Sequence, residues 1–105
     1  MSSHVAWAPR DRAEALVLLQ KGFAALQSAV MLAAGWRADP YVPPAGPIWN
    51  WWQLAGIPIV EQWQQFYAKQ DSSWSRFWTD WKTYEDWNAQ LLQLRDAAKT
   101  WGIHV

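Results

Sequence analysis

The first apolar pattern in the chain covers residues 11–34 and has the period of a helix. Asp11 followed by Glu14 matches a capping box, and Gly35 is suited to end a helix. Between them, apolar residues recur at alternating steps of three and four, which is the spacing of one buried helix face. They are Leu16, Leu19, Phe23, Leu26, Val30 and Ala33. The sequence therefore predicts a helix over about 11–34.

The remaining sides of this predicted helix are also rich in apolar residues. Outside the expected buried face lie Val17, Leu18, Ala25, Met31 and Leu32. The polar residues recur near a spacing of seven and form one narrow stripe, which consists of Glu14, Gln20, Lys21, Gln27 and Ser28. A helix that is apolar around most of its girth is normally buried around most of it. We therefore expect other helices, a partner subunit or a membrane to cover this helix.

Residues 36–57 form a second region with a different character. Four prolines argue against a regular helix, because proline lacks the N–H group and clashes with the preceding turn. They are Pro40, Pro43, Pro44 and Pro47. Residues 40–60 carry no charge, whereas a solvated linker is rich in charge, serine or glycine. We expect an extended, proline-rich apolar strap over 36–57, with one helical turn, packed across the helices.

The third region, 58–101, has apolar residues on a seven-residue repeat. Pro58 suits the first turn of a helix and Gly102 suits its end. A sustained period near 3.5 predicts a packing partner that supercoils with the helix. The centre of the repeat is marked by Phe77, Tyr84, Leu91 and Ala98.

The sequence Asp71-Ser72-Ser73 leaves two interpretations of this third region open. These residue types favour a helix N-cap, which predicts separate helices over about 58–70 and 72–101. The apolar phase nevertheless continues across them, which predicts one helix of about 65 Å at about 1.5 Å per residue. The expected fold is therefore an all-α single domain, residues 1–105, of two to three helices. We expect its two principal helices to lie antiparallel, or the last to project toward a neighbour.

Composition argues against most catalytic chemistry. The chain has no cysteine, which excludes disulfides, thiol catalysis and cysteine-ligated metals. Its two histidines, His4 and His104, are far apart in sequence, and the Glu-x-x-His motif of helical metal sites is absent. The sequence 72–75 contains serines that suit helix capping better than nucleophilic catalysis. We expect no enzymatic activity, no cofactor and no metal.

Charge and length bear on nucleic acids and membranes. Nine basic residues balance nine acidic ones, so no overall field attracts nucleic acid, and we expect no such partner. The uncharged stretch 22–36 is shorter than the about 20 residues that span a bilayer. A contact with the membrane surface stays open as an alternative. The N-terminus does not have the pattern of a signal peptide, so we expect the compartment of synthesis or an assembled particle.

Tryptophan is the most unusual component, with 11 residues among 105. Aromatic residues at helical spacing are commonly core residues, but tryptophan is also enriched at protein interfaces. One small domain has little interior for an apolar helix, an apolar strap and an aromatic tail. We therefore expect some of these indoles to bind a partner. The candidates are Trp49, Trp51, Trp52, Trp74, Trp78 and Trp81.

These observations favour a non-enzymatic structural or adaptor subunit. It would pack Trp-rich surfaces against partner proteins, or against another copy of itself, in a larger assembly such as a virus or phage particle. Two alternatives remain at this stage. One is a peripheral protein of the membrane interface, and the other is a binder of an apolar or aromatic small ligand in an indole-lined cleft.

Overall fold

The computed structural model is all-α, as the sequence predicts, and it describes residues 9–69 and 81–105. Four α-helices and one short 3-10 helix make up the described part of the chain, where two to three helices were expected. In order, they are α1 (Pro9–Ala33), α2 (Gly46–Ala55), α3 (Ile57–Lys69), α4 (Trp81–Ala98) and η2 (Lys99–Trp101). Within that part, the sole β-type pairing is an isolated antiparallel bridge between Arg37 and Val42.

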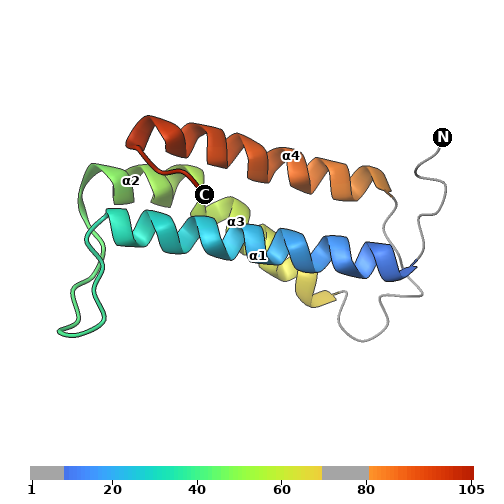
Figure 1. The fold of residues 1–105 in the computed structure, drawn as a ribbon, viewed down its shortest axis with the longest axis horizontal. Helices are drawn as coiled ribbons and strands as arrows, with labels where there is room; N and C mark the ends of the chain where they lie inside the picture. Colours follow the sequence, from blue (N-terminus) through green and yellow to red (C-terminus); the bar gives the residue numbers. More distant parts are fainter. Residues whose placement is uncertain (1–8, 70–80) are drawn as a thin grey trace.

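Helix α1 packs against each of the other three α-helices, and α4 runs alongside it (Figure 1). Helices α1 and α4 run in the same direction, and α3 runs opposite to both. The expectation that the two principal helices lie antiparallel was therefore wrong. A single straight helix over 58–101 is also excluded, because α3 and α4 point in opposite directions. The expected N-cap at 71–73 lies outside the described residues.

The strap predicted for 36–57 was wrong from Gly46 onward, because residues 46–55 form α2. Pro47 occupies the first turn of this helix, where its missing N–H group would have had no helical partner in any case. Proline at that position marks the start of a helix. Within the predicted strap, residues 36–45 and Gly56 lie outside the helices, and residues 36–45 form a loop that projects from the end of α1 (Figure 1).

The boundary between α2 and α3 follows from two neighbouring residues. Pro58 cannot donate a hydrogen bond to the carbonyl of Leu54, and its ring crowds that carbonyl. Gly56 is buried beneath the indole of Trp52, and a Cβ atom added to it would lie 2.3 Å from the ring. The turn between α2 and α3 can therefore pass this close to the Trp52 indole only with glycine at position 56.

Both predicted glycine stops are present. Gly35 has a φ of +93°, and its N–H group donates to the carbonyl of Leu32 at 3.1 Å. The N–H group of Trp36 donates to the carbonyl of Met31 at 3.0 Å, which completes a Schellman motif. Gly102, with a φ of +79°, ends the last helical turn with the same pair of bonds.

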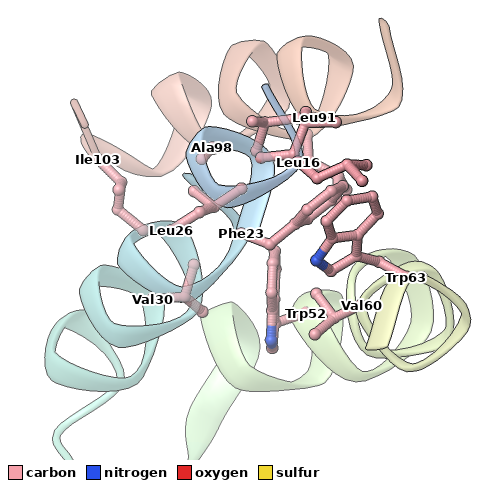
Figure 2. Packing of buried hydrophobic residues seen from close by; sticks show 12 residues of the cluster. Leu16, Phe23, Leu26, Val30, Trp52, Val60, Trp63, Leu91, Ala98 and Ile103 are labelled. Carbon is pink, nitrogen blue, oxygen red and sulfur yellow. The ribbon is translucent and has the colours of Figure 1, made fainter. Parts of the chain in front are cut away.

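The core is assembled on the predicted face of α1. Five of its expected members are buried, whereas Ala33 is exposed at the end of the helix. Helix α4 contributes the positions that continue its seven-residue repeat, and α2 and α3 contribute one fully buried tryptophan each (Figure 2). The core cluster consists of Leu16, Leu19, Phe23, Leu26, Val30, Trp52, Val60, Trp63, Leu91, Leu94, Ala98 and Ile103.

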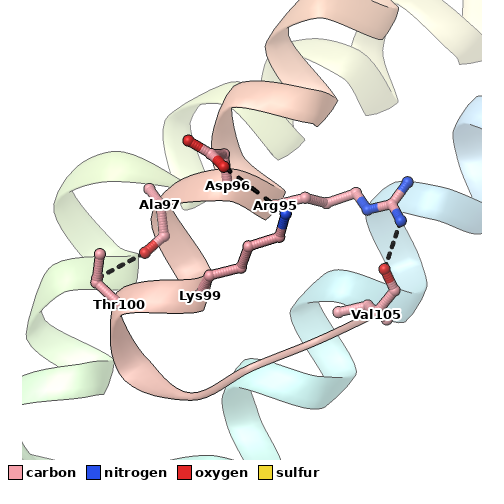
Figure 3. Close-up of polar contacts among 6 residues, drawn as sticks. All are labelled: Arg95, Asp96, Ala97, Lys99, Thr100 and Val105. Carbon is pink, nitrogen blue, oxygen red and sulfur yellow. Dashed lines mark hydrogen bonds and ion pairs between the residues drawn. The ribbon is translucent and has the colours of Figure 1, made fainter.

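The segment after Gly102 returns toward the helices and closes one end of this core. Ile103 is buried in it. The guanidinium group of Arg95 donates a hydrogen bond to the carbonyl oxygen of Val105 (Figure 3). The hydroxyl of Thr100 donates to the carbonyl of Ala97 at 2.7 Å. The C-terminal segment is therefore part of the fold.

Candidate protein-binding surface

Trp63 is the residue that joins three helices. Its ring lies 5.6 Å from that of Phe23 on α1 and 5.3 Å from that of Trp87 on α4, measured between ring centroids. Within α3 it also contacts Phe66 and Tyr67, at 5.6 and 5.5 Å. Aromatic pairs at these separations stabilise a core beyond the area that they bury. Trp63 therefore serves the fold of this chain.

The two fully buried indoles each find an acceptor on α1. The N–H group of Trp63 donates to the side-chain oxygen of Gln20, and that of Trp52 donates to Gln27 at 3.4 Å. Gln20 and Gln27 are seven residues apart, so they lie on one side of α1 and face α2 and α3. An indole N–H buried without an acceptor would be costly. Two members of the polar stripe on α1, Gln20 and Gln27, therefore serve as hydrogen-bond acceptors for the buried tryptophans of α2 and α3.

The structure separates the predicted partner-binding tryptophans. Trp52 is fully buried, so its ring is not available to a partner in this fold. Trp49 and Trp51 are half-buried and pack against the core. Trp51 also lies beside Trp101, with ring centroids 6.1 Å apart. Trp74 and Trp78, together with the side chain of Trp81, lie outside the described residues.

The exposed apolar surface of the described chain is mainly aliphatic. Leu54 is 83% exposed, Leu18 63% and Leu32 59%, whereas Trp101 is the most exposed described indole at 36%. Single exposed leucines are ordinary on protein surfaces. A contiguous group is informative, because it indicates a site that something else covers.

Such a group lies on α1, on the side that no other described helix covers. We call it the outward face of α1. Glu14 and Lys21 are the charged residues among its exposed members, and Ser28 is the polar one. The remaining exposed positions are Val17, Leu18, Ala24, Ala25, Leu32 and Ala33. Leu18, Ala25 and Leu32 are spaced by seven and therefore form one straight row along the helix.

The outward sides of α3 and α4 are different. On α3 the exposed residues include Glu61, Gln62, Gln65 and Lys69. On α4 they are mainly charged or polar, and Lys82 and Asp86 form an ion pair at 2.9 Å. The other exposed residues of α4 are Glu85, Ala89, Leu92, Gln93, Arg95 and Asp96. Among the described helices of more than ten residues, α1 therefore has the outward side that is least suited to water.

A groove borders the outward face of α1 on the side of α3. Its volume is about 150 Å³, which is below the about 300–1,000 Å³ of small-molecule sites. Ala24 and Ser28 belong both to this groove and to the outward face. The groove therefore extends the apolar surface and is too small for a drug-sized ligand. It is lined by Gln20, Phe23, Ala24, Gln27, Ser28, Val60, Trp63 and Gln64.

Two further features bear on the chemistry of this surface. The segment Ala13–Ala33 is long and apolar enough to cross a membrane by length and composition alone, and 33% of its most apolar window is buried in this structure. Core helices of soluble proteins also pass that test. Among residues 9–69 and 81–105, no three histidine, cysteine, aspartate or glutamate residues are grouped so that they could hold a metal ion.

Two features of the sequence pattern gain their meaning from the structure. The spacing of seven between Leu18, Ala25 and Leu32 marks an apolar row on the outward face of α1. The equal spacing of Gln20 and Gln27 marks acceptors for a neighbouring layer that carries indoles. Comparisons with known proteins add no further signal, because no family model, curated protein or solved structure matches the chain.

Proposed function

We propose that the protein is a non-enzymatic structural or adaptor subunit that binds a partner protein through the outward face of α1. The observation that carries this proposal is the exposure of Leu18 and Leu32 on a helix whose outward side has little charge. Exposed apolar groups rimmed by polar residues are typical of protein-binding sites. The proposal thus places the binding surface on aliphatic residues of α1. The sequence pattern, in contrast, predicted that tryptophans of other segments form that surface.

The half-buried tryptophans have a secondary role in this proposal. Trp51 and Trp101 lie together where α2 meets η2, and Trp101 is partly exposed. A partner that extends beyond α1 over this end of the molecule would bury them as well. We therefore retain Trp49 and Trp51 as candidates for the rim of the interface and assign Trp52 to the core.

The proposal is tested by photo-crosslinking in cells that naturally contain the protein. A photoreactive amino acid replaces Leu18, and in a control variant it replaces Leu92, which is 49% exposed on the outward side of α4. We expect a discrete protein adduct from position 18 and none of comparable yield from position 92. Equal and diffuse labelling from both positions would exclude the outward face of α1 as a specific protein-binding surface.

Membrane association is the second candidate function, and it rests on the length and apolarity of Ala13–Ala33. In this case the outward face of α1 would lie in the lipid interface. Flotation with vesicles of phosphatidylcholine and phosphatidylserine distinguishes the two functions. A protein-binding subunit stays with the soluble fraction, whereas an interfacial protein floats, and the variant Leu18→Lys floats less.

A further inference from the structure

We draw no further inference here: the strongest candidate, the largely apolar outward face of α1 along Leu18, Ala25 and Leu32, belongs to the surface already described, and nothing in the described part of the chain shows what covers it.

Discussion

Helices α1 and α4 lie side by side and run in the same direction, yet their outward sides have opposite chemistry. Both place large apolar residues in the shared core, and Gly22 of α1 lets Leu91 of α4 pack directly against the helix backbone. Outside the core, α4 presents mainly charged and polar residues and an ion pair, whereas α1 presents mainly leucine, valine and alanine beside Glu14, Lys21 and Ser28. The difference shows that α4 is a surface helix, and that α1 has a second, largely apolar side that no other described helix covers.

The largest expected effect separates the two sides of α1. Phe23→Ala removes a ring that contacts both Trp63 and Trp87, so we expect a loss of about 3–5 kcal/mol in the free energy of unfolding. Leu18→Ala removes an exposed side chain and should change it by less than about 0.5 kcal/mol. Urea denaturation at low protein concentration measures both. Equal losses would place Leu18 in the core.

The next largest loss of stability is expected where a side chain packs directly on a glycine, at Gly56 and at Gly22. In Gly56→Ala the new Cβ would meet the rigid indole of Trp52 at 2.3 Å, whereas in Gly22→Ala it would meet the end of the Leu91 side chain at 2.6 Å. We expect Gly56→Ala to cost about 1–3 kcal/mol. Gly22→Ala should cost less, since a leucine can shift and alanine favours a helix by about 1 kcal/mol.

Unfolding midpoints of the two variants give the order of the effects. Shortening the neighbouring leucine in the double variant Gly22→Ala, Leu91→Val should recover part of any loss from the first change. A larger loss of stability in Gly22→Ala than in Gly56→Ala would contradict this order. It would mean that Leu91 adjusts to the added methyl group less easily than Trp52 does.

A third comparison sets a glutamine that faces the core against one that faces solvent. Gln20→Leu removes the acceptor of the Trp63 indole N–H, and a buried donor without a partner costs about 1–3 kcal/mol. Gln93→Leu changes an exposed side chain of α4 and should shift stability by less than about 0.5 kcal/mol. Chemical denaturation with tryptophan fluorescence measures both variants. A negligible effect of Gln20→Leu would mean that the indole has another acceptor.

The smallest effect belongs to the outward side of α4. Asp86→Asn breaks the ion pair with Lys82, in which both side chains are largely exposed. Such pairs, four residues apart on a helix, contribute about 0.3–0.5 kcal/mol. Thermal unfolding at low and high salt should show that small difference shrinking as salt screens the pair. A larger effect at high salt would indicate a role for Asp86 beyond this pair.

The sequence was most informative where one local rule decides the structure. The core face of α1 and its glycine stop follow from spacing and from a positive φ, and both predictions are confirmed. The prediction of a strap was wrong at Pro47. Proline in the interior of a helix breaks it, whereas proline in the first turn is compatible with the start of a helix. Sequence pattern alone does not distinguish these two positions of the residue.

The relative direction of the helices and the roles of the tryptophans could not be predicted from the sequence, because both depend on tertiary structure. A period of seven gives the face that a helix buries but not the direction of its neighbour, so the parallel pair of α1 and α4 was missed. The prediction that Trp52 is an interface residue was wrong, because a tryptophan in a proline-rich segment has the same pattern whether it is buried or exposed. Its partners, Gln27 and Gly56, are identified only once α1 and α2 are placed together.

The central claim is that the outward face of α1 is covered in the cell while that of α4 is not. Carbene footprinting of Leu18 and Leu92 measures this directly, since both leucines are exposed in the single chain, at 63% and 49%. In dilute purified protein, both should be labelled to a similar degree. In intact cells that contain the protein, we predict a severalfold loss of labelling at Leu18 and none at Leu92, because a protein interface excludes the reagent from its centre. Unchanged labelling of Leu18 in those cells would contradict the claim.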